Sequence, residues 1–216
     1  EPIVAIATGF ERSTNNRKIG PKMIQIWILD QRAKPTDIVK QNKDSSICGK
    51  CELRPKDGQG TGKCYVNIGQ GPNAIWEKWK RGGYEKFNLN KFKGYSVRFG
   101  AYGDPDLIHK NIVKSIVNIC NSHTGYTHAW VNKKFDWTRN YFQASCSNLN
   151  MYKAAKKKGF HTFTVLSNGD KTPKDSRLCD NVTKGTQCVD CMKCDGSADI
   201  HIPVHGNSAV MKKWEN

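Results

Sequence analysis

Residues 95–131 decide the fold, and they read YSVRFGAYGDPDLIHKNIVKSIVNICNSHTGYTHAWV. Residues 95–101 are rich in the β-branched and aromatic side chains typical of strands, and residues 125–131 have a similar composition. Between these runs, residues 106–121 place apolar side chains at the three- and four-residue spacing of a helix. A strand, a helix and a second strand in this order predict a right-handed crossover between parallel strands.

The same alternation extends outward along the chain. Strands are also predicted at residues 23–29, 141–146, 160–166 and 199–204. Helices are also predicted at residues 73–81 and 150–158, each of which is followed by a glycine. We therefore expect an α/β fold of alternating strands and helices, either a partial barrel or a parallel sheet. In such folds ligands bind beyond the carboxyl ends of the strands.

The pattern changes after Ser167. Residues 168–196 are rich in Gly, Asp, Lys and Cys and lack apolar periodicity. A segment with so little apolar surface cannot offset its chain entropy without metal–ligand bonds. We expect an α/β core at residues 1–167, which carries the first cysteine group, and a small cysteine-rich, metal-bound appendage with a final strand at residues 168–216.

The chain is strongly basic. It has 35 Lys and Arg against 19 Asp and Glu, a formal net charge of +16, which favours phosphate-bearing partners such as nucleic acid. The alternative interpretation is that these lysines only solvate the surface. No run approaches the roughly 18 consecutive apolar residues of a membrane span, and no signal peptide opens the sequence. We expect a cytoplasmic protein without a membrane partner.

Nine cysteines carry most of the chemical information, and four of them form a C-terminal group. This group is Cys179-x8-Cys188-x2-Cys191-x2-Cys194. Consecutive two-residue spacings let thiolates converge on one iron–sulfur cluster or on one zinc ion, with Cys179 as the fourth ligand. Disulfides are the other interpretation, but bridges between such close cysteines would be strained. Cys120 falls on the apolar face of its predicted helix and is expected to be a core thiol.

The first cysteine group has three members, Cys48-x2-Cys51-x12-Cys64. Three thiolates leave a fourth coordination position for water, substrate or cofactor. A closed zinc site is the alternative, and it needs a fourth protein ligand. The candidates for that ligand are Cys146, His128, His201 and His205.

Two resemblances follow from these motifs. The segments CGKCELRP at 48–55, GKCYVNIGQGP at 62–72, RFGAYGDP at 98–105, GYTH at 125–128 and IPVHG at 202–206 together resemble an uncharacterised family of tailed-phage proteins, which would place the protein in the host cytoplasm. The layout also resembles radical S-adenosylmethionine enzymes. It has three cysteines after an early strand, the last in a Cys-Tyr pair, then Gly103-Asp104-Pro105 in place of Gly-Glu-Pro, and a cysteine-rich C-terminal extension. The twelve residues before Cys64 depart from the usual Cys-x3-Cys-x2-Cys spacing.

The second resemblance implies a cofactor site. An iron–sulfur cluster on Cys48, Cys51 and Cys64 would leave one iron for the amino and carboxylate groups of S-adenosylmethionine, and that cofactor would supply the radical chemistry. The residues expected around it are Gly100, Gly103, Asp104 and His128. Gly103 would permit close approach of the backbone, and Asp104 would accept a hydrogen bond from the amine.

Two other functions fit the sequence, which leaves open whether the protein is an enzyme. One is a zinc-stabilised nucleic-acid-binding protein, in which basic residues interleave with the aromatic side chains of Trp76, Trp79, Tyr84 and Phe87. The other is a metal-dependent nicking enzyme. It would use His201-x3-His205 as metal ligands and one of three tyrosines, Tyr126, Tyr141 or Tyr152, as the nucleophile.

Overall fold

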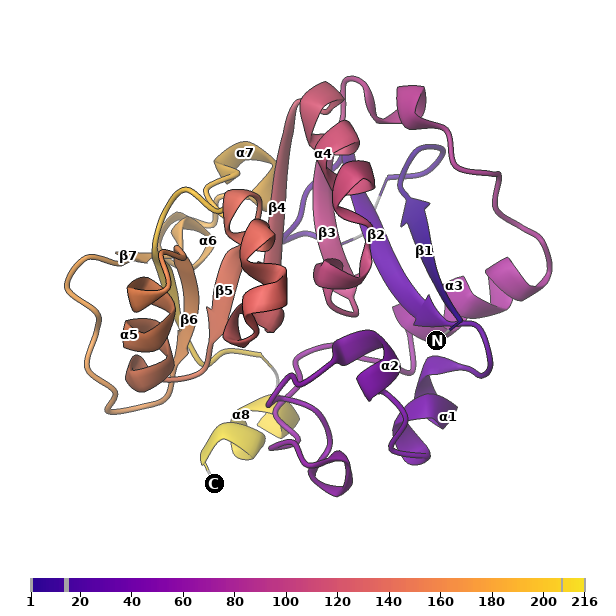
Figure 1. The fold of residues 1–216 in the computed structure, drawn as a ribbon. Coiled ribbons are helices and arrows are strands. Elements are labelled where there is room, and N and C mark those ends of the chain that lie inside the picture. The colour runs from indigo at the N-terminus through magenta and orange to yellow at the C-terminus, as the bar shows by residue number, and fades with distance from the viewer. Residues whose placement is uncertain (1, 14–15, 207, 216) are drawn as a thin grey trace.

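The structure is a computed structural model that describes residues 2–13, 16–206 and 208–215. It is an α/β fold built on one eight-stranded sheet (Figure 1). The strands are β1 (Ile3–Thr8), β2 (Met23–Asp30), β3 (Ser96–Tyr102), β4 (Ser122–Thr127), β5 (Gln143–Cys146), β6 (Thr162–Leu166), β7 (Arg177–Leu178) and β8 (Ile200–Pro203). The helices are α1 (Pro35–Lys40), α2 (Ser45–Cys48), α3 (Gly71–Lys80), α4 (Lys110–Ile119), α5 (Leu149–Lys157), α6 (Asp180–Lys184), α7 (Cys188–Cys191) and α8 (Ser208–Glu215). The predicted α/β class is confirmed.

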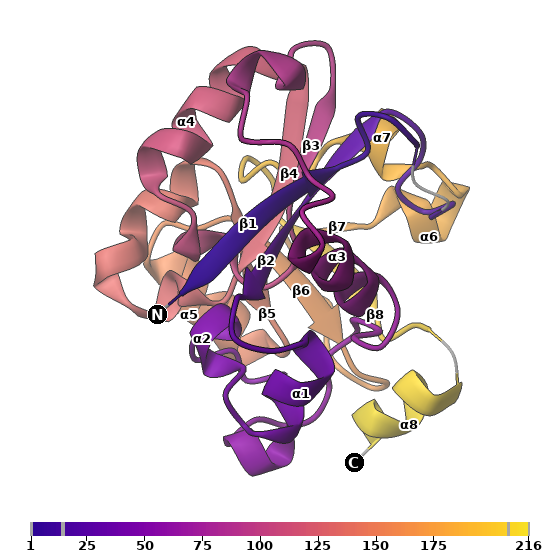
Figure 2. The same cartoon turned by 90° about the vertical axis from the view of Figure 1, so that its right-hand side faces the viewer.

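The strand order is β1-β2-β3-β4-β5-β6-β8-β7. β1 pairs with β2 in the antiparallel sense, and every other pair of neighbours is parallel. From β2 to β6 the strands therefore follow one another in space as they do in sequence, without a switch point. Crossovers of one hand keep their helices on one face of such a sheet, and α4 and α5 lie together on the same side (Figure 2).

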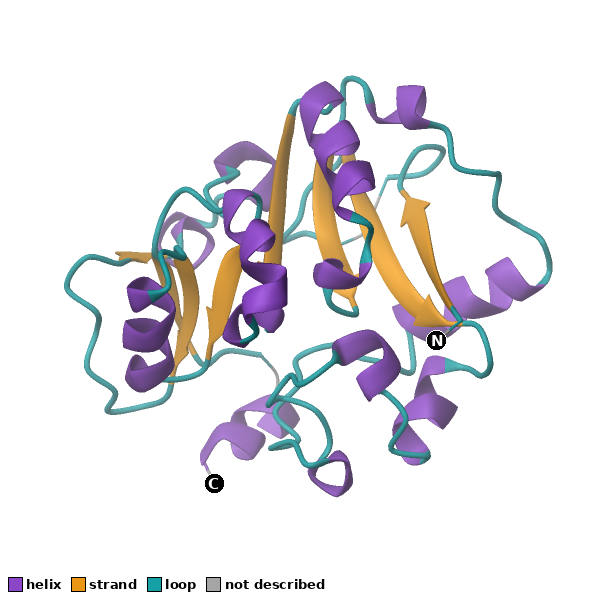
Figure 3. Cartoon of the chain, viewed as in Figure 1, coloured by secondary structure: helices purple, strands orange, loops and turns teal. Residues whose placement is uncertain are grey.

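The apolar core lies between the sheet and these helices. Val97 and Phe99 of β3 are fully buried, as are Val113 and Ile116 of α4, which belong to the same cluster. A smaller cluster packs Ala144 of β5, Ala155 of α5, and Trp130, Cys146 and Phe160 together. Long connections, drawn as loops and short helices in Figure 3, join the strands, and the longest of them links β2 to β3.

Several predicted elements are confirmed, with shifted ends. The strand predicted at 125–131 is β4 at 122–127, because residues 129–131 turn into a short 3-10 helix. The helix predicted at 106–121 begins only at Lys110, since a 3-10 turn precedes it and the ring of His109 accepts from the backbone N–H of Asn111. The helix predicted at 150–158 is α5, which the side chain of Asn148 caps.

The segment after Ser167 packs onto the sheet. It supplies β7 and β8, and α6 and α7 lie on the side opposite to α4 and α5 (Figure 2). The backbone N–H groups of Cys188 and Val189 donate to the carbonyls of Lys18 and Ile19, both at 2.9 Å. The region expected as an appendage therefore reaches across to the β1–β2 connection. None of the helices in the described ranges is long and apolar enough to cross a membrane.

Candidate metal centre

A cavity of about 360 Å³ lies on the sheet face that α4 and α5 leave uncovered. Most of the strand residues in its lining alternate along the parallel strands. They are Arg98, Gly100 and Tyr102 of β3, Thr124 and Tyr126 of β4, Ser145 of β5, and Phe163 and Val165 of β6, and Ala101 of β3 also lines it. Successive side chains of a strand point to opposite faces, so residues such as Val97 and Phe99 enter the core instead. Tyr102 and Val165 border both the cavity and apolar clusters.

All seven cysteines of the two groups line this cavity. They are Cys48, Cys51, Cys64, Cys179, Cys188, Cys191 and Cys194. The first three come from the connection between β2 and β3, and the other four come from the segment around α6 and α7. The remaining two lie elsewhere, Cys120 at the end of α4 and Cys146 buried in the cluster beside α5. All nine are free thiols.

The three thiols of the first group influence one another. Burial raises the pKa of Cys48 well above its usual value, and the neighbouring Cys64 and Cys51 raise it further. Burial also raises the pKa of Cys64, and Cys51 adds to this effect. Crowded, desolvated thiolates are unfavourable unless a cation offsets their charge. This donor set therefore fits a bound metal or cluster.

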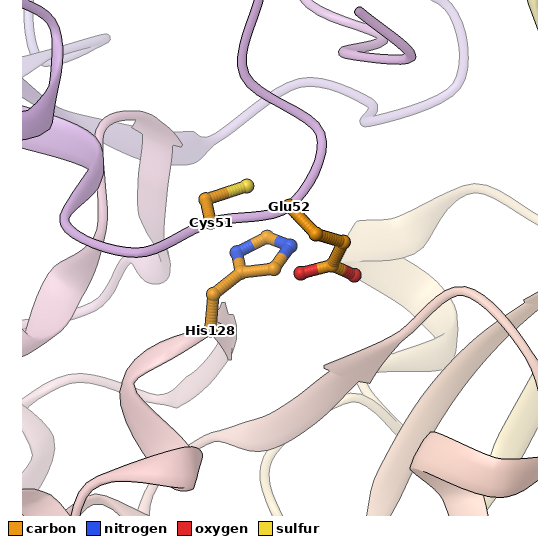
Figure 4. A group of neighbouring side chains, drawn as sticks. All are labelled: Cys51, Glu52 and His128. Carbon is orange, nitrogen blue, oxygen red and sulfur yellow. The ribbon is translucent and has the colours of Figure 1, made fainter. Parts of the chain in front are cut away.

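His128 and Glu52 join this group. The ligand atoms of Cys51, Glu52 and His128 lie within 4.8 Å of one another, and Figure 4 shows the three side chains pointing toward one another. Glu52 Oε1 and His128 Nε2 are both buried and have no hydrogen-bond partner in the described part of the chain. Burial alone would lower the pKa of His128, but Cys51 and Asp104 outweigh it and raise that pKa well above its usual value.

Asp104 orients His128. Its Oδ2 accepts the backbone N–H of His128 at 2.7 Å and lies 3.6 Å from the ring Nδ1, while its Oδ1 accepts the hydroxyl of Thr127 at 2.7 Å. A carboxylate behind a histidine is the usual way of directing the other ring nitrogen toward a metal. Each oxygen of Asp104 accepts one hydrogen bond from the chain, and Asp104 lines the cavity, so its proposed contact with a cofactor amine stays a prediction beside this orienting role.

Gly100 and Gly103 border the same cavity. Both have positive φ angles, +69° and +79°, which glycine adopts without steric penalty. A Cβ at Gly103 would lie 2.7 Å from Ile28 Cβ and 2.8 Å from the Ile28 carbonyl oxygen. The backbone therefore runs tightly against β2 here, and the next N–H, that of Asp104, donates to the Ile47 carbonyl at 2.8 Å. The turn after β3 is thus tied to the helix that carries Cys48.

The second group has a different setting. Burial raises the pKa of Cys194 to about 12, although the Tyr126 hydroxyl opposes this by hydrogen bonding. Burial also raises the pKa of Cys188, and the positive charges of Arg98 and Lys18 oppose part of this rise. Across the described residues, Cys51, Glu52 and His128 form the one set of three Cys, His, Asp or Glu ligand atoms within 4.8 Å. Neither the three sulfurs of the first group nor any three of the second are therefore that close together among the described residues.

The four candidates for a fourth ligand of the first cysteine group differ in their position relative to its thiols. His128 lies beside Cys51, whereas His205 lines the cavity but stacks on Tyr65 with ring centroids 5.3 Å apart. His201 lies outside the lining, with its Nδ1 3.0 Å from the Ser176 hydroxyl. The lining also omits Cys146. Of the three tyrosines considered as nucleophiles, it includes Tyr126 and omits Tyr141 and Tyr152.

The basic and aromatic segment at α3 lies apart from the lining residues. The Nζ of Lys80 sits over the rings of Trp76 and Trp79, at 5.4 and 5.6 Å from their centroids. Trp76 also donates its indole N–H to the Asp30 carbonyl at 2.9 Å and packs against the core. Among the aromatic residues proposed for stacking on bases, Phe87 is 61% exposed.

Two site residues were missed by the sequence analysis, Glu52 and Arg98. Glu52 directly follows Cys51, a predicted metal ligand, and this position in the sequence was the signal that could have identified it. Arg98 is the single charged residue in the strand-like run YSVRFGA, and a charge inside an apolar strand indicates a special environment. Comparison with protein-family models, with curated proteins and with solved structures finds no match to this chain.

Proposed function

We propose that this protein is an iron–sulfur enzyme that acts on S-adenosylmethionine, with one cluster on Cys48, Cys51 and Cys64 and a second on the four C-terminal cysteines. The observation that carries the proposal is that both cysteine groups line one cavity over a sheet of sequentially ordered parallel strands. This arrangement supports the radical-enzyme resemblance of the sequence. A merely structural metal site needs no such cavity.

The sequence spacing of the cysteines supports a cluster over a single zinc ion. The C-terminal group contains the consecutive spacings Cys188-x2-Cys191-x2-Cys194, which are more typical of a four-iron cluster than of a zinc site, where separate Cys-x2-Cys pairs are usual.

The chain's own residues would hold and shield the reacting groups. When bound, the cluster and S-adenosylmethionine supply the radical chemistry. Three cysteine ligands leave one iron for that cofactor, and the backbone at Gly100 and Gly103 borders the space beside it. Asp104 keeps His128 oriented. The rings of Tyr126 and Phe163, with centroids 4.4 Å apart, add apolar surface to the cavity wall.

Anaerobic purification followed by iron, sulfide and zinc analysis tests the proposal. We expect iron and sulfide in equal amounts and a broad visible absorbance band from sulfur-to-iron charge transfer. Cys64→Ser should remove the iron of the first cluster and abolish reductive cleavage of S-adenosylmethionine, and Cys191→Ser should remove only the iron of the second. Cys120→Ser is the matched control, because Cys120 lies outside the cavity lining. Wild-type protein that takes up iron but never cleaves the cofactor would contradict the enzymatic part.

A zinc centre is the second candidate, favoured by the trio Cys51, Glu52 and His128. Its sulfur, nitrogen and oxygen atoms are donors that zinc accepts, and two of them are buried without a partner. This outcome would appear as stoichiometric zinc without a visible band. It would support the zinc-stabilised nucleic-acid-binding protein, whose affinity should then fall with salt by a log–log slope of about one per phosphate contacted.

A further inference from the structure

We propose that the cavity binds a small anionic substrate, one that carries a phosphate or carboxylate group, and that Arg98 and Lys18 hold this group. The proposal rests on the proposed function, because it names the class of molecule that the same cavity would take. Two observations support it. Arg98 and Lys18 line the cavity, and neither forms an ion pair with a carboxylate of the described residues.

Arg98 projects from β3 into the cavity, in register with Gln25 of β2 and Thr124 of β4. Its side chain is partly buried, yet no hydrogen bond or ion pair reaches it from any described residue. Arg54, in contrast, pairs with Asp44 at 2.8 Å. Withdrawing a guanidinium from water without a counter-ion is unfavourable. An anion bound in the cavity would offset that loss.

Lys18 supplies a second positive charge from the β1–β2 connection. Its Nζ lies 3.1 Å from His205 Nε2, and none of the described carboxylates forms an ion pair with it. The third cation of the lining, Lys193, is already paired with Asp180 at 2.7 Å. Asp104 is the single acidic residue among the described lining residues, and the chain engages both of its oxygens. Apart from the cysteines, the described lining residues therefore carry more positive than negative charge.

Arg98 and Lys18 line the cavity together with Cys188 of the second group. The backbone N–H of Cys188 donates to the Lys18 carbonyl at 2.9 Å. Gly100 stands two residues further along β3, about 7 Å away at the rise of a strand, and leads toward the first group. A substrate whose anionic end rests on Arg98 would thus extend toward the thiols of Cys48, Cys51 and Cys64. The planar fork of an arginine suits two oxygens of a phosphate or a carboxylate.

Calorimetric titration of the purified protein with inorganic phosphate and, separately, with succinate tests the assignment. Arg98→Gln should weaken binding of the preferred probe about tenfold or more, as expected for loss of charge-assisted hydrogen bonds. Lys18→Gln should weaken it less, since lysine offers a point charge. Arg139→Gln is the control, because Arg139 is exposed and outside the lining. The probe that binds more tightly tells phosphate from carboxylate recognition.

Iron content measured on the same samples separates this proposal from the cluster proposal. Anion binding that depends on Arg98 in protein without iron would uphold the substrate class and refute the clusters. Unchanged affinity in both Arg98→Gln and Lys18→Gln overturns the substrate class whatever the iron content. If Arg98→Gln loses iron while its anion affinity is unchanged, Arg98 is a charge partner of the second cysteine group and the proposal fails. Lys18→Gln carries the test alone if Arg98→Gln does not fold.

Discussion

The backbone N–H of His128 and its ring Nδ1 both face one carboxylate oxygen, Oδ2 of Asp104, at 2.7 and 3.6 Å. This contact joins the turn after β3 to the turn after β4. It fixes the side chain that approaches Cys51 most closely among the candidate fourth ligands. The orientation of the His128 ring therefore depends on Asp104, which is not itself part of the group formed by Cys51, Glu52 and His128.

Asp104→Asn tests this dependence. An amide oxygen can still accept from the N–H of His128, but the NH2 group cannot accept from the Thr127 hydroxyl, and both hydrogen bonds lose their ionised acceptor. Hydrogen bonds to a charged group contribute about 1.5–3 kcal/mol, and we expect the free energy of unfolding to fall by about 2 kcal/mol in urea denaturation. Asp57→Asn is the control at an exposed carboxylate. Equal stability of the two variants would show that Asp104 does not organise the turn.

Gly103→Ala and Gly159→Ala form a matched pair. Their φ angles are +79° and +77°, but a Cβ at Gly103 would clash with Ile28, whereas nothing lies within 4 Å of a Cβ at Gly159. The left-handed conformation alone costs about 1–2 kcal/mol, which is the expected loss for Gly159→Ala. Overpacking should add about 1–3 kcal/mol at Gly103. Thermal and urea unfolding of both variants measures the difference, and similar losses would contradict the tight approach to β2.

Asp30 should account for part of the loss of folding stability at low pH. Hydrogen bonds from the Arg32 side chain lower the pKa of Asp30 from 3.8 to about 2. Because the folded-state pKa is depressed, this carboxylate stabilises the fold above its unfolded pKa of 3.8, and the contribution disappears as the pH falls toward 2. Asp30→Asn should lower the free energy of unfolding by about 1–2 kcal/mol at neutral pH, allowing for the exposure of Arg32.

Urea denaturation of wild type and Asp30→Asn at neutral pH and at about pH 3 checks this linkage. The gap between the two proteins should narrow at the lower pH. A gap that stays constant across this range would mean that the Asp30 carboxylate is not the titrating group.

Trp214 fastens α8 beside the first cysteine group. Its ring is buried and lies 5.4 Å from that of Tyr65, and its indole N–H donates to the Lys63 carbonyl at 3.2 Å. Trp214→Ala should release the backbone around Cys64, because a buried tryptophan contributes about 3–5 kcal/mol to its packing. Hydrogen exchange at residues 63–66 should accelerate. Lys213→Ala changes an exposed residue of the same helix and should leave the exchange rate at residues 63–66 unchanged. Slow exchange in both variants would show that α8 does not stabilise the backbone around Cys64.

Local patterns in the sequence predicted much of the sheet and several helices. The apolar run at residues 23–29 became β2, and the spacing in residues 106–121 became α4 after its first turn. These patterns are local, because a strand or helix face is set by residues a few positions apart. The short spacings within the C-terminal cysteine group are local too, and Cys188 and Cys191 share the single turn of α7.

Local patterns missed elements that depend on distant partners. β1 exists as an edge strand because it pairs with β2. The sequence analysis names no helix after Val204, but α8 lies there and is held by the contacts of Trp214 with Tyr65 and Lys63. The run IVAIAT at residues 3–8 is itself a strand signal that the prediction left out, whereas the contacts that hold α8 could not be predicted from composition.

The sequence by itself determined which residues could bind metal, since thiols at two-residue spacing have few other uses. Only the tertiary structure decided that both cysteine groups line one cavity, that His128 and Glu52 lie beside Cys51, and that Arg98 enters the cavity without an ion pair to any of the described carboxylates. The reason is physical. Spacing along the chain sets contacts within one turn or strand, whereas these neighbours meet because parallel strands follow one another in the sheet and the segment after β7 crosses back to Lys18 and Ile19.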